Sequence, residues 1–430
     1  MIRATDPTTG DSPYESGQVS VAQLRRWRNA VVVSFALGGV TLAAFGTRLP
    51  SIQAALEVSK TAIGTALVSL TLASLAGLSV ASWVHTELGA RSGIFAALLI
   101  AAVGIATVGV GAGATGSLPV TTVGLAAIGL GIGLLDVLIN VEGAALEVML
   151  GRSLMPFLHA CWSAGAILGA GIGALGAALA VPVQWQFTAE GLVISLAAGV
   201  VAASIPAHAD LPREDASTDY ALSRPQRLRR WASQWTNPWL LLIGLVMLGA
   251  ELGEGSANTW LTLAARDSKG HGEGVAAIFF VLFATAETLA RLSGGPFVDR
   301  FGRAAVVRAT SAAGVVGVVL FILTGSTWLT AAGVVLWAVG VSMGFPLGMS
   351  AAAEAGPRPA AQVSAVAAIG YAANLAGPPT LGALADHVGL LRSLWVVAAL
   401  LAVACTFATA VRSRPAPSPA PTPVTSTETN

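Results

Sequence analysis

The chain has 430 residues, of which 54% are hydrophobic and only 10% are charged, and its formal net charge is +1. A mean hydropathy of +0.74 excludes an ordinary water-soluble domain. The balance of charges gives no reason to expect a nucleic acid as a partner. The composition is that of a protein that crosses a lipid bilayer several times.

Apolar runs long enough to span a membrane recur along the chain. About 20 apolar residues form a helix that crosses roughly 30 Å of hydrocarbon, and twelve segments approach that length. They are residues 29–49, 61–84, 92–112, 118–143, 156–180, 187–206, 238–263, 275–294, 304–324, 328–350, 362–384 and 390–411. The sequence therefore predicts an all-α integral membrane protein with twelve transmembrane helices.

The positive charges predict the orientation of these helices. With both termini in the cytoplasm, most of the 23 Lys and Arg residues fall on the cytoplasmic side. The exceptions are Arg48, Lys60, Arg266, Lys269 and Arg392. The positive-inside rule selects this orientation, and an odd number of helices would destroy the asymmetry.

Polar stretches divide the chain into two halves. We expect residues 1–28 to form a cytoplasmic N-terminal segment, and residues 207–237, which contain several prolines, to form a cytoplasmic central loop. The proline-rich residues 412–430 are predicted to be a disordered cytoplasmic tail. Two six-helix bundles, at 29–206 and 238–411, remain.

The first half holds few polar side chains within its apolar segments. Arg48 ends the first segment, where it either extends to the periplasmic interface or binds an anionic substrate. Cys161 and Cys405 lie in apolar segments without the Cys and His spacing of a zinc site. We therefore expect no disulfide, metal or other cofactor.

Asp136 lies roughly 26 Å along the 118–143 segment, with Asn140 one turn further on the same face. An acidic group within a bilayer is costly and is a candidate functional residue by default. One interpretation is that both side chains line a cavity. The other is a structural cluster that closes the cytoplasmic gate, and its members would be Asp136, Asn140, Glu142, Glu147, Arg152 and His159.

We favour the gate for Glu147 and Arg152, which lie near the membrane interface. For His159 two roles stay open. An imidazole titrates near neutral pH and can relay protons, but a hydrogen-bonded structural histidine fits equally well.

Two acidic residues occupy the 238–263 segment. Glu254 lies roughly 22 Å from its cytoplasmic start, and Glu251 lies three residues earlier on nearly the same face. A carboxyl group there can couple proton movement to transport or bind substrate. The alternative is a hydrogen bond between helices. Asn258 and Trp260 follow as candidate substrate contacts.

The 275–294 segment contains Glu287 and Arg291, four residues apart in the order that favours an ion pair. We predict that this pair is structural and that Arg291 neutralises Glu287. In the 362–384 segment, Tyr371 and Asn374 precede two prolines that interrupt the helical hydrogen bonds. Both are candidate substrate contacts, although Asn also joins helices.

The loop at residues 294–303 reads G-G-P-F-V-D-R-F-G-R. It is similar to the loop signature of the major facilitator superfamily, G-x-L-x-D-R-x-G-R. Small residues permit close helix packing and an acidic side chain can cap a helix N-terminus. We expect the residues of this loop signature to pack or cap neighbouring helices or to form part of a conformational gate. They are Gly295, Asp299, Arg300, Gly302 and Arg303. The corresponding stretch 82–91 keeps only Gly89 and Arg91, which argues against a loop-based latch there.

The halves also repeat weakly at an offset of about 210 residues. Beyond the loop, almost the whole chain resembles a bacterial inner-membrane subgroup of the fucose-permease-like branch. The matching residues include Arg48, Pro50, Asp136, Asn140, Glu147, Arg152, Met155, His159, Glu254, Gly255, Trp260, Arg291, Asp299, Gly302, Gly370, Tyr371, Gly377 and Pro378. Thr259 replaces an acid that is usual in the subgroup, so one expected carboxylate is missing.

This resemblance implies two six-helix pseudo-repeats that rock around a midplane site, in a monomer of the bacterial inner or plasma membrane. We expect a secondary-active transporter of a small organic solute, coupled to protons and directed to uptake of a sugar-like or other polar solute. Drug or metabolite efflux by proton antiport is the alternative. A membrane enzyme or a non-transporting sensor is disfavoured, because the sequence lacks catalytic motifs and an appended signalling domain.

Overall fold

The computed structural model describes residues 20–206, 233, 236–356 and 358–413. The predicted N-terminal segment, central loop and C-terminal tail lie largely outside the described residues. Within the described ranges, the regular elements are helices and no strand is present. The all-α prediction is confirmed.

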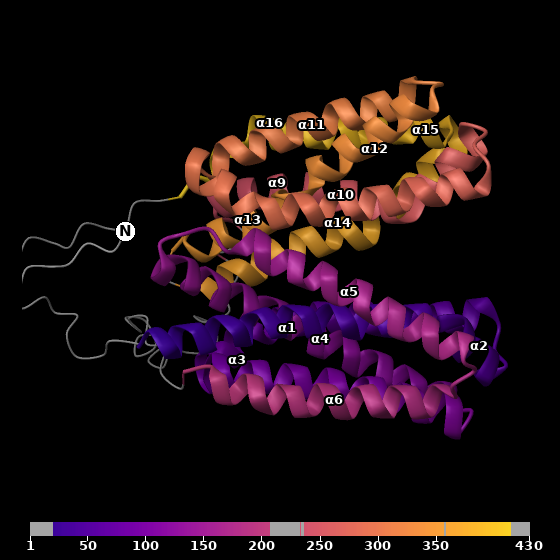
Figure 1. Cartoon of the computed structure of the whole chain (residues 1–430), viewed down its shortest axis with the longest axis vertical. Helices are drawn as coiled ribbons and strands as arrows, with labels where there is room; N and C mark the ends of the chain where they lie inside the picture. Colours follow the sequence, from indigo (N-terminus) through magenta and orange to yellow (C-terminus); the bar gives the residue numbers. More distant parts are fainter. Residues whose placement is uncertain (1–19, 207–232, 234–235, 357, 414–430) are drawn as a thin grey trace, which may run out of the picture.

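The first half of the chain forms one group of helices (Figure 1). Its elements are α1 (Val21–Thr47), α2 (Leu49–Leu56), α3 (Lys60–Gly109), η1 (Val110–Ala114), α4 (Leu118–Leu150), α5 (Met155–Ala178) and α6 (Val183–Ser204). Helix α3 packs along α4 and α6, and α1 packs along α5.

The second half forms another group beside the first (Figure 1). Its elements are α9 (Pro238–Leu263), η2 (Ala264–Ser268), α10 (Glu273–Phe301), α11 (Arg303–Leu323), α12 (Thr327–Ser342), α13 (Gly344–Ala353), α14 (Pro359–Val388), α15 (Leu390–Ser393), α16 (Trp395–Thr406) and η3 (Ala408–Val411). Helix α11 packs against α12 and α16, and α9 contacts α14 and α16.

Nine helices among the described residues are long and apolar enough to cross a membrane. One of them, Thr65–Ala114, contains two predicted segments that meet at a kink. Helix α14 and the shorter apolar stretch Leu390–Thr406 correspond to the last two predicted segments. Each of the twelve predicted segments therefore coincides with helix.

Equivalent glycines produce similar backbone turns in the two halves. Gly89 has φ +73° and ψ 168° at the kink of α3, and Gly302 has φ +82° and ψ 155° between α10 and α11. A side chain disfavours positive φ, so glycine is the residue suited to both turns. This agreement supports the internal repeat in the sequence.

The two groups of helices meet along α3, α4 and α5 on one side and α10, α13 and α14 on the other. Close approach depends on small residues, because a Cβ atom on Gly294 would lie 2.5 Å from the Met343 side chain and 3.2 Å from Pro156. A Cβ on Gly295 would lie 3.2 Å from the Ser153 carbonyl oxygen. The α10 glycines thus bring polar residues of both halves within bonding distance.

Candidate functional site

A buried guanidinium occupies the contact between the two halves. Arg291 of α10 is 7% exposed. Its Nη2 lies 2.8 Å from Glu254 Oε2 and 2.7 Å from Glu287 Oε1. Its Nη1 donates a hydrogen bond to Ser163 Oγ of α5 at 3.2 Å. One side chain therefore binds two carboxylates of its own half and a hydroxyl of the other half.

A break in a neighbouring helix supplies a further partner for Arg291. Helix α12 ends at Ser342 and α13 begins at Gly344. The carbonyl oxygens in the last turn of a helix lack intrahelical donors. Arg291 Nε donates to the Ser342 carbonyl oxygen at 3.3 Å.

Glu251 extends this group of charges. It is 9% exposed, and its Oε2 accepts a hydrogen bond from Asn374 Nδ2 of α14 at 3.1 Å. Its Cγ packs against Gly370, where a Cβ would lie 3.2 Å away. Electrostatic interactions link it to Glu254 and Arg291. We call Ser163, Glu251, Glu254, Glu287, Arg291 and Asn374 the central cluster.

The predicted ion pair of Glu287 and Arg291 is part of a larger group of charges. The i, i+4 pair forms as expected, but Glu254 shares the same guanidinium nitrogen. Helix α9 packs against α10, which brings an acid from another segment to Arg291. The spacing within one helix could not show this third member. Glu254 is the more accessible carboxylate, since its side chain is 20% exposed and that of Glu287 is 9% exposed.

The first half contributes a line of polar side chains. Asn140 Nδ2 donates to the Asp136 carbonyl oxygen at 2.8 Å and lies 3.3 Å from Asp136 Oδ1. Asn140 Oδ1 lies 3.1 Å from His159 Nε2. The His159 ring meets Phe35 and Phe345 edge to face. We call Asp136, Asn140 and His159 the polar line.

Tyr371 of α14 connects the polar line to the second half. Its side chain interacts with Asp136, and its ring meets Phe345 edge to face at a centroid distance of 6.2 Å. Asp136 is 3% exposed, and its Oδ2 has no hydrogen-bond partner within hydrogen-bonding geometry among the described residues. The predicted candidates Asp136, Asn140, Tyr371 and Asn374 thus lie where the halves meet.

A second set of charges joins the halves near the loop signature. Arg303, at the start of α11, forms hydrogen bonds to Glu354 at 2.7 and 2.8 Å and lies 3.2 Å from Glu147 Oε2 of α4. Ser350 Oγ of α13 donates to the same Glu147 oxygen at 2.6 Å. Arg303 is 7% exposed, so these ion pairs are largely shielded from solvent.

The short loop between α4 and α5 takes part in this set. Glu147 Oε1 accepts from the backbone N–H groups of Leu154 and Met155 at 2.7 and 2.8 Å, which caps the N-terminus of α5. Asp299 Oδ1 accepts from the Ser153 N–H at 2.6 Å, close to the predicted position at a neighbouring helix N-terminus. We call Glu147, Ser153, Asp299, Arg303, Ser350 and Glu354 the inter-half cluster.

The structure separates the residues that were considered for a single gate cluster. Glu142 accepts a hydrogen bond from Trp27 Nε1 at 2.7 Å, and His159 belongs to the polar line. Arg152 is exposed and lines a cavity of about 340 Å³ with Glu147 and Asp299. Glu142, His159 and the Glu147–Arg152 pair therefore have different partners, because they occupy different faces of α4 and α5 or the connecting loop.

Three other candidates are not among the defined members of the central cluster. Asn258 is exposed on α9, and Trp260 lies against Gly382, where a Cβ would be 2.9 Å from the indole. Arg300 is exposed, with its guanidinium carbon 5.4 Å from the centre of the Phe301 ring.

Arg48 is buried at the end of α1. It is 3% exposed, and its Nη2 donates to the Val181 carbonyl oxygen at 2.6 Å. An electrostatic interaction connects it to Glu190 of α6. The α5–α6 connection covers this side chain. The sequence of the first apolar segment alone could not predict this contact with a distant part of the chain.

Sequence reasoning missed Ser163, Ser350, Glu354 and Trp27. Serine is common in helices, and its hydroxyl usually bonds to its own backbone. Glu354 follows an apolar segment and resembled an ordinary interfacial acid. The signal that could have identified Ser163 is its place one turn after His159 on α5.

The arrangement of two helical groups around an internal polar site matches known proteins. A profile of the Major Facilitator Superfamily matches residues 30–373 and 252–429. The chain belongs to the Major Facilitator Superfamily. Membership confirms the sequence-based expectation of a membrane transporter with a small-molecule substrate, and not an enzyme.

Related superfamily sequences match the chain along nearly its whole length. An uncharacterized transporter of Sinorhizobium fredii, y4wD, is 28% identical over 395 residues, which cover 90% of this chain and 99% of the relative. The membrane protein MosC of Rhizobium meliloti is 24% identical over 378 residues, covering 87% and 88% of the two chains.

Solved superfamily structures share the fold. The Escherichia coli fucose:proton symporter FucP has a TM-score of 0.72 and 18% identity, covering 91% of this chain and 100% of that one. The human organic anion transporter MFSD10 has a TM-score of 0.69 and 16% identity, covering 90% and 99%. These similarities confirm the fold that the sequence predicted.

Proposed function

We propose that this superfamily member takes up a small polar solute together with protons by alternating access. The observation that carries the proposal is the shared position of Arg291, which binds Glu254 and Glu287 of one half and Ser163 of the other. The contacts within a site that is built from both halves change whenever the halves move relative to each other. Solute and proton binding can therefore be linked to that motion.

The charges of the central cluster support proton coupling. Glu251, Glu254 and Glu287 surround a single guanidinium, that of Arg291. Each uncompensated ion costs several kcal/mol when it is removed from water. Proton binding to a carboxyl group removes that cost while the site is closed, and access to water allows the proton to leave. Glu254, the more exposed acid, is the residue that we assign to proton exchange.

We assign the solute to the space between the central cluster and the polar line. Asp136, Asn140 and Tyr371 offer hydrogen-bond acceptors and donors at that boundary, and Asn374 is held by Glu251. Amide, carboxyl and phenol groups pair well with the hydroxyls of a sugar-like solute. Proteins of the same fold include a fucose:proton symporter and a proton:xylose symporter, which supports this assignment.

The inter-half cluster is proposed as the cytoplasmic gate. Glu147 and Arg303 join the halves on one side of the central cluster, and Asp299 binds the Ser153 backbone beside them. Opening toward the cytoplasm must break these contacts. We further propose that both termini are cytoplasmic and that the protein works as a monomer in the bacterial inner membrane, as the distribution of Lys and Arg and the resemblance imply.

Reconstitution tests coupling and its sign. Purified protein in liposomes with a trapped pH dye would be exposed to external sugars, organic acids or cationic drugs. Symport makes solute entry acidify the interior, whereas antiport makes it alkaline, and this difference does not depend on how the protein is oriented in the liposome. We expect acidification with a polar solute and none in protein-free liposomes. Alkalinisation would support the efflux alternative, and solute entry without a pH change would contradict coupling.

A further inference from the structure

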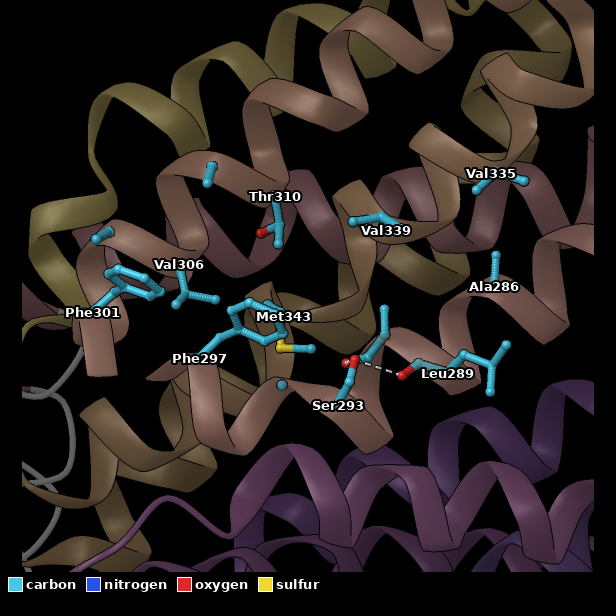
Figure 2. A pocket seen from close by; sticks show the side chains of 14 residues that line it. Ala286, Leu289, Ser293, Phe297, Phe301, Val306, Thr310, Val335, Val339 and Met343 are labelled. Carbon is cyan, nitrogen blue, oxygen red and sulfur yellow. Dashed lines mark hydrogen bonds between the residues drawn. The ribbon is translucent and has the colours of Figure 1, made fainter. Parts of the chain in front are cut away.

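A large apolar groove lies on α10, α11 and α12 (Figure 2). Its volume is about 720 Å³. Small residues of α10 and α11 form much of the wall, and Phe297 and Phe301 border one end. The lining residues are Ala286, Leu289, Ala290, Ser293, Gly294, Phe297, Phe301, Ala305, Val306, Ala309, Thr310, Val335, Val339 and Met343.

The groove offers almost no polar group to an occupant. Ser293 Oγ donates to the Leu289 carbonyl oxygen at 2.8 Å, and Thr310 Oγ1 donates to the Val307 carbonyl oxygen at 3.2 Å. Both hydroxyls are therefore engaged by their own helices. A polar solute would lose its hydration there without gaining hydrogen bonds. A hydrocarbon chain makes no hydrogen bonds, so it has none to lose in the groove.

The groove is open at the surface of these helices and is long enough for an acyl chain. Leu289, Phe297 and Phe301 are 58%, 56% and 57% exposed. From Ala286 to Phe301, α10 rises about 22 Å, which exceeds the roughly 15 Å of hydrocarbon in one leaflet. A chain lying in the groove would thus be covered along most of its length.

A positive charge lies at one end of the groove. Arg300 is exposed, and its guanidinium carbon lies 5.4 Å from the centre of the Phe301 ring, which lines the groove. This contact fixes the cation where an acyl chain would leave the groove and reach the headgroup region. An anionic phosphate is the complement of an arginine in that position.

From this geometry we infer that the groove binds one acyl chain of an anionic phospholipid from the leaflet that contacts the loop signature, with the lipid phosphate on Arg300. Two residues of the lining are sequence neighbours of Arg291 or of its partner Ser342. Met343 lines the groove and follows Ser342, whose carbonyl oxygen binds Arg291. Ala290 lines it as well and precedes Arg291 in α10. A bound lipid therefore supports the helix break that holds Arg291.

Photolabelling of the full-length protein in liposomes tests this site. The probes are phosphatidylglycerol and phosphatidylcholine, each with a diazirine on the acyl chain, followed by peptide mapping. We expect the phosphatidylglycerol probe to label α10 and α11 saturably and to be displaced by unlabelled phosphatidylglycerol. Ala309→Trp, which fills the groove, should reduce labelling by roughly tenfold. Val316→Trp, an exposed position of α11 outside the lining, should leave it unchanged.

The headgroup contact has its own matched pair of variants. Arg300→Gln should remove the preference for phosphatidylglycerol over phosphatidylcholine. Arg308→Gln removes an equally exposed positive charge of α11 that does not line the groove and should keep the preference. Labelling spread evenly over lipid-facing helices, or equal labelling of Ala309→Trp and Val316→Trp, would overturn the inference. Displacement by an apolar drug but not by phospholipid would also overturn it and would assign the groove to that ligand.

Discussion

Arg291 Nη1 lies 3.2 Å from Ser163 Oγ, and this contact joins residues 128 positions apart in the chain and in different halves of the fold. The same guanidinium holds Glu254 and Glu287. Any movement of the halves changes the partners of a buried cation. Substitution of Arg291 is therefore the first test of this site.

Arg291→Gln should destabilise the protein by about 3 to 5 kcal/mol, because it leaves buried carboxylates without their cation. The triple variant Arg291→Gln, Glu254→Gln, Glu287→Gln removes those charges as well and should recover most of the stability without recovering transport. Thermal unfolding in detergent and solute flux in liposomes measure the two effects. Equal stability of the single and triple variants would refute the charge balance described above.

Glu254→Gln should abolish solute-driven proton movement while solute exchange between equal internal and external concentrations continues. The amide keeps a hydrogen-bonding group beside Arg291 but cannot exchange a proton. Glu287→Gln is the matched control, because Glu287 also pairs with Arg291 and its side chain is less exposed than that of Glu254. Proton flux that survives in Glu254→Gln and disappears in Glu287→Gln would reverse the assignment.

Glu147→Ala should weaken the inter-half cluster and raise access from the cytoplasm. It removes the partner of Arg303 and Ser350 and the cap on Leu154 and Met155. Labelling of a single cysteine introduced at Ser153, in a variant without Cys161 and Cys405, reports that access. Ser350→Ala removes only one of these bonds and should have a smaller effect. No change in labelling with Glu147→Ala would argue against the gate.

Trp27→Phe should destabilise the first half by about 1 to 3 kcal/mol, because Glu142 is 4% exposed and loses its indole donor. The double variant Trp27→Phe, Glu142→Leu removes the unsatisfied acid and should be less destabilised. Chemical or thermal unfolding measures both. An unchanged midpoint in Trp27→Phe would mean that water replaces the indole.

Gly302→Ala should cost about 1 kcal/mol or more through its φ of +82°. A Cβ at this position would meet nothing within 4 Å, so crowding makes no contribution. Gly325→Ala is a control in which a Cβ also meets nothing and φ is not positive. Similar unfolding midpoints for the two variants would show that the turn tolerates a side chain.

The sequence by itself determined the class of the protein, the helical segments and the family. Apolar length alone predicts a spanning helix, because every backbone group in a bilayer must be satisfied within the segment. Local chemistry also predicted the Glu287 and Arg291 pair and the place of Asp299 beside α5. Such contacts can be predicted from the spacing of residues along one helix, or from the tendency of an acidic side chain to cap a neighbouring helix.

The tertiary structure decided which polar residues share partners. Glu254 joins Arg291 because α9 packs on α10, and Glu147 joins Arg303 because α4 lies near the start of α11 at the contact between the halves. It also placed Arg48 under the α5–α6 connection. Periodicity predicts the face of a helix on which a side chain lies, but the packing of whole helices decides what that face meets.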